Sequence, residues 1–334
     1  MDTTEKETTP EYAIGIDIGG TNTKFGIVNH RGEISNEGNI DTFKHDKVEE
    51  FVDELYEVLQ PAIQNVGGEK FIKGIGIGAP NGNYYTGTID YAPNLQWKGI
   101  IPLAKLITEK FNKPCTLTND ANAAAVGEMM YGAARGMRDF IMITLGTGVG
   151  SGIVANGQLI YGHDGFAGEL GHTIIRPGGR LHWGTAMHGC LEAYASATGI
   201  AITAREMLDN HPDEKSLLRD FRYDEITSKK VFEAASKGDK IAKDVFTFTG
   251  GILGEALANF VMFSSPEAII LFGGVTKAGS MLMDPVKESM EKNLLSIFQN
   301  KVKLIFSELK ESDAAILGAS ALVWEIKKDD PTNK

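Results

Sequence analysis

Two glycine-rich turns, far apart in the chain, contain the residues whose types and spacing could do chemistry. The first lies within residues 17–28 and the second within residues 144–154, each between two apolar strands. Glycine permits positive φ and has no Cβ to keep a ligand away from the backbone. Successive exposed N–H groups in such turns bind anions. Two such turns, one in each half of a duplicated fold, predict a nucleotide triphosphate held between two lobes.

Two aspartates extend this interpretation, Asp17 at the end of a predicted strand and Asp120 just after another. Asp17 lies beside the first turn, where a buried carboxylate needs a cation, and a Mg²⁺ ion carried by the nucleotide would supply one directly or through water. Asp120 lies where a strand meets a helix, and a helix N-terminus favours the ionised carboxylate. Such a carboxylate can accept a hydroxyl proton during phosphoryl transfer. A plain helix N-cap explains Asp120 equally well, so this residue alone leaves both interpretations open.

Other polar residues suggest a ligand rich in hydroxyl groups. Glu169, His172 and Glu192 follow the second turn, and glycine-flanked carboxylates can accept hydrogen bonds from a small polyol. Exposed glutamates are nevertheless most often solvated surface charges. Asn94 adds an amide within a loop that also contains Trp97. Taken alone, this loop is uninformative about function. Neither turn has the spacing of a P-loop or of a dinucleotide-binding fingerprint.

Composition sets the class of protein. The chain has 334 residues, a net charge of -11 and two cysteines, Cys115 and Cys190. This cysteine content argues against a disulfide framework and predicts a reducing cytoplasm. Proteins that bind nucleic acid are usually basic, so the charge argues against that partner. No apolar run approaches the roughly 20 residues that span a bilayer, and we expect no membrane association.

The elements that must position these residues recur along the chain. Apolar patterning predicts strands, then helices and strands, before and after residue 119, which indicates an α/β fold with helices on both sheet faces. The predicted helices cover residues 48–63, 101–111, 281–298 and 314–327, and much of 191–263. The predicted strands cover residues 12–18, 23–29, 71–78, 115–118, 140–145, 152–155, 267–272 and 302–306. We expect residues 1–11 to form a disordered tail, 12–118 with 312–330 a small lobe, and 119–311 a large lobe.

Taken in order, the motifs resemble those of the ROK family of bacterial sugar kinases, within the actin, hexokinase and Hsp70 superfamily. The resemblance runs from about residue 13 to residue 322, nearly the whole chain. It implies a two-lobed, actin-like ATPase fold, similar to ribonuclease H, whose duplicated mixed β-sheet core is flanked by helices. Segments 17–24 and 145–152 resemble the phosphate motifs, 271–275 the adenosine motif, and 119–128 and 250–259 the helices connecting the lobes.

The resemblance also implies a role for each matching residue. Asp120 matches the catalytic base, and Asp17 would face the magnesium ion of ATP. The residues that match sugar ligands are Asn94, Asn119, Asp120, Glu169, His172 and Glu192. The residues that match the nucleotide site are Asp17, Gly19, Gly20, Thr21, Asn22, Thr23, Lys24, Gly146, Thr147, Gly148, Gly150, Gly273 and Gly274.

One segment departs from the family pattern. The family usually binds zinc between the counterpart of His172 and three cysteines, but residues 181–190 retain only Cys190 and are two residues longer. A site with three cysteines and one histidine cannot form, so zinc is not expected. His182, His188, Cys190 and His172 are the groups from which a different metal site could be built. We expect packing by Leu181, Trp183 and Met187 to replace the metal.

The resemblance predicts an enzyme that phosphorylates glucose to glucose 6-phosphate with Mg·ATP, with lobe closure excluding water. Kinases for N-acetylmannosamine, N-acetylglucosamine or fructose, and polyphosphate as donor, remain alternatives. A sugar-sensing transcriptional regulator is the alternative of another class, and we disfavour it because about a dozen residues before the first strand are too few for a helix-turn-helix. The resemblance further implies a homodimer.

Overall fold

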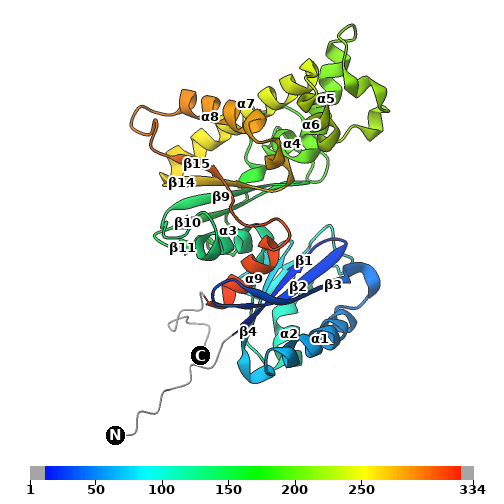
Figure 1. Cartoon of the computed structure of the whole chain (residues 1–334), viewed down its shortest axis with the longest axis vertical. Coiled ribbons are helices and arrows are strands. Elements are labelled where there is room, and N and C mark those ends of the chain that lie inside the picture. Colours follow the sequence, from blue (N-terminus) through cyan, green and yellow to red (C-terminus); the bar gives the residue numbers. More distant parts are fainter. Residues whose placement is uncertain (1–11, 325–334) are drawn as a thin grey trace. The chain divides into compact units, whose positions relative to one another are not determined.

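The computed structural model describes residues 12–324 and divides them into two compact units. Unit 1 comprises residues 12–135, 161–167 and 308–324, and unit 2 comprises residues 136–160 and 168–307. The tail predicted for residues 1–11 lies outside the described residues, as does the end of the helix predicted for 314–327. Each unit has its own sheet, helices and core (Figure 1).

Unit 1 contains a five-stranded mixed sheet. Its strands are β1 (Tyr12–Ile18), β2 (Asn22–Asn29), β3 (Ile34–Asp41), β4 (Ile72–Ala79) and β8 (Cys115–Asn119), in the spatial order β3-β2-β1-β4-β8. Antiparallel pairing joins β1, β2 and β3, whereas β1, β4 and β8 run parallel. The carboxyl ends of β1, β4 and β8 therefore lie at one edge of the sheet.

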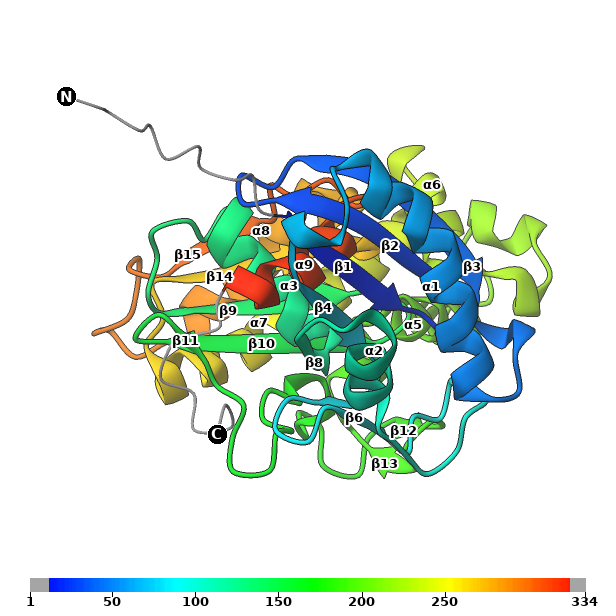
Figure 2. The same cartoon turned by 90° about the horizontal axis from the view of Figure 1, so that it is seen from below.

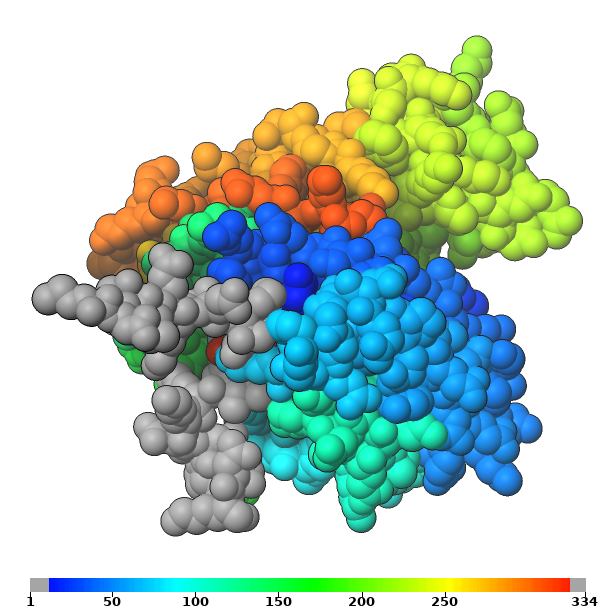
Figure 3. All heavy atoms as spheres, turned by 60° about the horizontal axis from the view of Figure 1, so that its bottom comes forward, coloured from blue at the N-terminus to red at the C-terminus, as the bar shows by residue number. Residues whose placement is uncertain are grey.

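Helices cover both faces of this sheet because β1 alternates between two kinds of residue. Ile14, Ile16 and Ile18 share a core with α1 (Val48–Asn65) and α2 (Leu103–Phe111). Gly15, on the opposite face, lets α9 (Ala314–Trp324) approach so closely that a Cβ there would lie 2.2 Å from a carbonyl oxygen of that helix. Helix α3 (Asp120–Tyr131) packs beside α9 (Figure 2). The solvent side of α1, in blue to light blue, forms part of the surface in Figure 3.

Three short strands complete unit 1 and support a loop. They are β5 (Gly82–Asn83), β6 (Thr88–Asp90) and β7 (Ile100–Ile101), which form an antiparallel sheet. The loop between β6 and β7 contains residues 93–97, and its Trp97 is buried against Phe51 of α1, with ring centroids 4.7 Å apart. This anchor determines where the exposed Asn94 lies.

Unit 2 repeats the strand arrangement of unit 1. Its sheet has the order β11-β10-β9-β14-β15, with an antiparallel hairpin on one side and parallel strands on the other. The strands are β9 (Phe140–Leu145), β10 (Val149–Ala155), β11 (Gln158–Leu159), β14 (Ala268–Phe272) and β15 (Lys303–Phe306). The duplicated mixed sheet expected from the sequence is therefore confirmed. Asn156 and Gly157 between β10 and β11 both have positive φ, as a type I′ turn requires.

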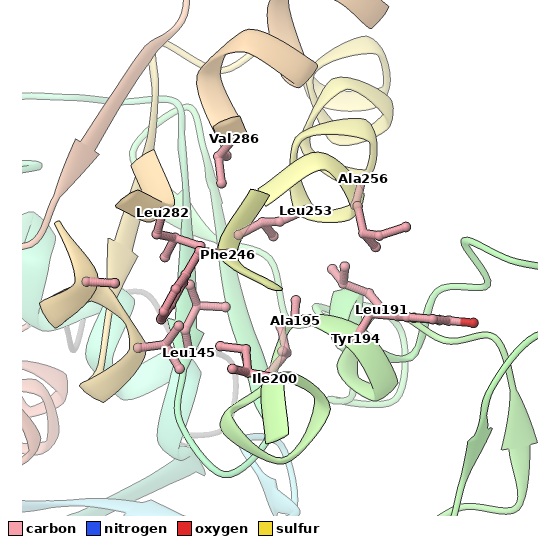
Figure 4. Packing of buried hydrophobic residues seen from close by; sticks show 14 of the residues in the cluster. Leu145, Leu191, Tyr194, Ala195, Ile200, Phe246, Leu253, Ala256, Leu282 and Val286 are labelled. Atoms are coloured by element: carbon pink, nitrogen blue, oxygen red, sulfur yellow. The ribbon is translucent and has the colours of Figure 1, made fainter. Parts of the chain in front are cut away.

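The helices of unit 2 enclose its core. They are α4 (Glu192–Ala195), α5 (Ala197–Asn210), α6 (Ser228–Ser236), α7 (Lys240–Ser264) and α8 (Ser280–Asn293). Figure 4 shows Leu145, Phe246 and Leu253 within that core. Among the described residues α7 alone is long and apolar enough to cross a membrane, but 67% of its most apolar window is buried, which is typical of a core helix. A hairpin of β12 (Leu181–His182) and β13 (Met187–His188) lies outside the sheet.

Two boundaries differ from the sequence expectation. The predicted large lobe begins at residue 119, whereas the compact units separate after residue 135, because α3 packs against α9 of unit 1. The helix predicted for 281–298 ends at Asn293, and the chain continues through turns to β15. Apolar spacing beyond that residue reflects the burial of Leu294 and the partial burial of Phe298 in the core, which occur without a helix.

Candidate active site

The first glycine-rich turn, between β1 and β2, is closed by its own backbone. The N–H of Gly19 donates to the carbonyl oxygen of Asn22 over 3.1 Å, and the carbonyl oxygen of Thr21 accepts from Thr42 over 2.9 Å. The side chains of Thr21, Asn22 and Lys24 are exposed. Thr23 is fully buried, and its hydroxyl lies 2.9 Å from that of Thr42. Its burial leaves Thr23 no atom exposed to a ligand, and its hydroxyl ties the hairpin to the segment after β3.

Asp17 and Asp120 lie on either side of Gly78 at the carboxyl edge of the parallel strands. Asp17 pairs in register with Gly78, which in turn pairs with Thr118 of β8. A Cβ on Gly78 would lie 3.7 Å from an Asp17 carboxylate oxygen and 3.6 Å from the Asp120 Cα. The absence of a side chain at position 78 thus leaves space between the two aspartates.

The surroundings of both carboxylates favour the protonated form. Burial raises the pKa of Asp17 from 3.8 to about 6, the charge of Asp120 adds to this, and Lys24 opposes it. Asp120 is exposed, yet the surrounding protein displaces enough water to raise the pKa of its carboxyl. Hydrogen bonds from backbone N–H groups act in the opposite direction and lower this pKa. One of these comes from Ala121 over 2.7 Å. Asp17 in particular lacks enough nearby positive charge to stabilise its ionised form, because Lys24 only partly offsets the effects of burial and of Asp120.

The two asparagines that are predicted to bind sugar, both in unit 1, are positioned in different ways. Asn94 lies over the first turn, because a Cβ on Gly20 would be 3.1 Å from the Asn94 carbonyl oxygen and 3.7 Å from its side-chain nitrogen. Asn119 is the N-cap of α3, and its side-chain oxygen accepts from the N–H of Ala121 over 2.9 Å. The cap leaves the side-chain NH₂ of Asn119 as the donor available to a ligand.

The second turn, between β9 and β10, lies beside the predicted adenosine turn. The N–H of Gly146 donates to the carbonyl oxygen of Gly148 over 3.0 Å, and Gly150 donates to the Thr144 hydroxyl over 3.1 Å. Thr147 at the tip is exposed. Gly273 follows β14 with φ of 107°, and a Cβ there would lie 2.5 Å from the Leu145 carbonyl oxygen. Gly274 begins a short 3₁₀ helix after it.

The three residues of unit 2 that are predicted to bind sugar, Glu169, His172 and Glu192, form one cluster with His182. His172 Nε2 lies 3.8 Å from a Glu169 carboxylate oxygen, and the ring centroids of His172 and His182 are 5.9 Å apart. His182 Nε2 lies 2.8 Å from Glu192 Oε1, and Glu192 Oε2 accepts from the N–H of Val149 over 2.6 Å. Sequence reasoning named His182 only as a metal ligand and missed its contact with Glu192.

The same cluster contains the groups from which a metal site could be built. Donor atoms of His172, His182 and Cys190 lie within 4.8 Å of one another, and His172 Nδ1 is buried without a hydrogen-bond partner. His188 is elsewhere, with its Nδ1 3.0 Å from the Gly179 carbonyl oxygen. A structural zinc site takes four ligands. The described residues supply three here, and both nitrogens of His182 are already engaged, so the donor set does not fit the closed zinc site of the family.

Comparison with known proteins adds three findings. The sequence profile of the ROK family matches residues 13–326. A glucokinase of Halalkalibacterium halodurans is 37% identical over 96% of both chains, and a xylose repressor of Caldicellulosiruptor bescii is 29% identical over 93% of this chain and 77% of its own. Among solved structures, a ROK family glucokinase from Streptomyces griseus in complex with glucose and AMPPNP superimposes with a TM-score of 0.76. It is 33% identical, with 93% of this chain and 98% of that chain covered.

Proposed function

This chain belongs to the ROK family, and from that premise we propose that it is an ATP-dependent glucokinase that forms glucose 6-phosphate. The observation that carries the proposal is the pair of carboxylates, Asp17 and Asp120, on either side of Gly78 at one sheet edge. The glucokinase relative and the solved glucokinase complex support the choice of glucose and ATP. The actin-like fold of the family accounts for the repeated sheet in the two units.

In unit 1, Asp120 is the proposed base. Its carboxylate would accept the proton of the 6-hydroxyl as the oxygen attacks the terminal phosphorus, and its raised pKa makes it a better proton acceptor than an ordinary aspartate. Asn119 and Asn94 would donate to sugar oxygens and so fix the acceptor's orientation. The exposed residues of the first turn would bind phosphate through backbone N–H groups.

Asp17 is the residue that we propose faces magnesium. Its buried carboxylate fits a cation, because Lys24 opposes only part of the cost of ionising it beside Asp120. A magnesium ion bound with ATP would neutralise charge on the transferring phosphoryl group. Asp17 would orient the nucleotide through that ion, directly or through its water.

In unit 2, Glu169, His172 and Glu192 would accept or donate hydrogen bonds to sugar hydroxyls. Glu192 has two of its acceptor positions occupied by His182 and Val149, and a carboxylate offers about four. The second turn and the Gly273–Gly274 turn lie side by side, and we assign them to the phosphates and the adenosine of ATP. We further propose that the enzyme works in the cytoplasm as a homodimer, which family membership supports.

The test is formation of sugar phosphate from glucose, N-acetylglucosamine, N-acetylmannosamine, mannose and fructose, with Mg·ATP or polyphosphate as donor. We expect glucose to give the highest kcat/KM. Preference for an acetamido sugar would keep the mechanism and replace the substrate. Turnover with polyphosphate but not with ATP would reject ATP as the phosphoryl donor. No turnover with any sugar and either donor would overturn the proposal and favour a sensor, the class to which the xylose repressor belongs.

A further inference from the structure

Glu192 is held from two directions. His182 Nε2 lies 2.8 Å from one carboxylate oxygen, and the N–H of Val149 lies 2.6 Å from the other. The His182 and Glu192 side chains are only 21% and 15% exposed. Both contacts are therefore partly shielded from water, where a charge-assisted hydrogen bond is stronger than at an open surface.

His182 is itself fixed by its neighbours. Its Nδ1 lies 2.8 Å from the Thr185 hydroxyl, which can donate to it, so that the Nε2 hydrogen is directed to Glu192. The hairpin register pairs His182 with Met187 and Leu181 with His188. Because adjacent strand residues point to opposite faces, His182 and His188 lie on different faces of the hairpin. This explains why only His182 joins the cluster.

The Glu192 carboxylate has little freedom on its other side. A Cβ on Gly148 would lie 2.4 Å from Glu192 Oε2, so the carboxylate is in close contact with the second glycine-rich turn. The two donors and this contact restrict how the Glu192 carboxylate can rotate. A carboxylate fixed in this way is suited to distinguishing hydroxyl positions on a sugar.

We propose that His182 is a positioning residue that orients Glu192 for sugar binding and that it does so by a hydrogen bond rather than through a metal ion. The inference rests on the proposed function, in which Glu192 binds the sugar. It assigns to the hairpin of residues 181–188 a role in sugar affinity, although none of its side chains needs to touch the sugar. The matched control is His188, which is on the other hairpin face and bonds to a backbone carbonyl.

The experiment measures sugar affinity, KM and kcat for five variants of the full chain. His182→Leu removes the donor, and we expect the Kd and KM for the sugar to rise about tenfold while kcat changes less than threefold. His182→Gln keeps an N–H donor and should recover most of the affinity. His188→Leu should stay within twofold of wild type. In the Glu192→Gln background, adding His182→Leu should cause no further loss, because His182 acts through Glu192.

The outcomes separate this inference from the function on which it rests. Weaker sugar binding in Glu192→Gln with none in His182→Leu would overturn the inference and leave the glucokinase proposal intact. Unchanged sugar binding in Glu192→Gln would overturn both the inference and the role of Glu192. Mass spectrometry of the purified chain tests the metal: one equivalent of zinc, whose removal reproduced the His182→Leu defect, would show that a metal ion positions Glu192.

Discussion

At the scale of single residues, the two carboxylates beside Gly78 face different demands. Asp120 has hydrogen bonds from backbone N–H groups and an accessible surface, so it can ionise and still receive a substrate proton. Asp17 is more deeply enclosed, with the charge of Asp120 near it and Lys24 as its opposing cation. In the proposed function the first would exchange a proton and the second would accept a cation.

Asp120→Asn tests the proton acceptor. The amide keeps the size and can still accept a hydrogen bond, but it cannot take up a proton at neutral pH. We expect kcat to fall by about 10²–10⁴-fold, with the sugar Kd within threefold of wild type. Asp213→Asn, an exposed aspartate in unit 2, is the control. Steady-state kinetics with nearly normal kcat in Asp120→Asn would reject the assignment of the base.

Asp17→Asn tests the cost of the buried charge. A pKa raised from 3.8 to about 6 means that the Asp17 carboxyl contributes most to stability below pH 4 and that this contribution is lost as the pH rises through about 6. In magnesium-free buffer we expect the variant to be more stable than wild type at pH 8, by up to about 3 kcal/mol, with little difference at pH 4. Urea unfolding at the two pH values measures this.

Magnesium and ATP should favour the wild type over Asp17→Asn, the opposite of the order of stability expected in magnesium-free buffer at pH 8. If Asp17 faces the ion, Mg·ATP at pH 8 should stabilise the wild type more than Asp17→Asn, because only the wild type gains a cation beside its carboxylate. Equal stabilisation of both proteins would reject the magnesium role and leave the pKa argument untouched.

Residue types alone indicated most of the candidate site. Asp17, Asp120 and the glycines lie at strand ends, and strand ends can be predicted from the apolar pattern of the sequence. The burial of the Thr23 hydroxyl could not be foreseen, because its partner Thr42 is distant in sequence and joins it only when β2 and β3 pair. His182 was likewise ambiguous with His188, since strand alternation separates them only once the hairpin register is known.

At the scale of elements, the packing of α7 on α8 depends on glycine. A Cβ on Gly254 would lie 2.4 Å from the Val286 carbonyl oxygen and 2.6 Å from the Ser289 Cβ. Gly251, one turn earlier on the same helix, would have nothing within 4 Å of its Cβ. These two glycines share a helix and differ in whether another helix occupies the space where a Cβ would lie, which the sequence does not distinguish.

Alanine at each position tests that contact. Gly254→Ala should lower the free energy of unfolding by about 1–3 kcal/mol, because α8 must move away from α7. Gly251→Ala should be neutral or stabilising by up to about 1 kcal/mol, since alanine favours the helix. Chemical denaturation compares the two, and equal destabilisation would show that helix α8 does not approach α7 closely at Gly254.

At the scale of the whole molecule, duplication was visible in the order of the elements rather than in residue identity. Two strand pairs with glycine-rich turns, each followed by further helices and strands, predicted two related sheets, and both have the same spatial order. The boundary between the units was less predictable. Helix α3 follows β8 directly in sequence, but its packing against α9, nearly 200 residues later, determines the unit to which it belongs.

The net charge of the whole chain argues for the enzyme over a DNA-binding regulator. A net charge of -11 opposes approach to a polyanion, and a protein that binds duplex DNA gains affinity chiefly by neutralising phosphates with basic residues. Non-specific binders reach a Kd of about 10⁻⁴–10⁻⁶ M at physiological salt.

We expect fluorescence anisotropy of labelled duplex DNA to show no binding by the full chain at about 10⁻⁵ M, with or without glucose. A basic DNA-binding protein in the same assay is the positive control. Binding that weakened steeply with salt and changed with sugar would instead place this chain functionally with the repressors of its family, whatever kinase activity it also showed.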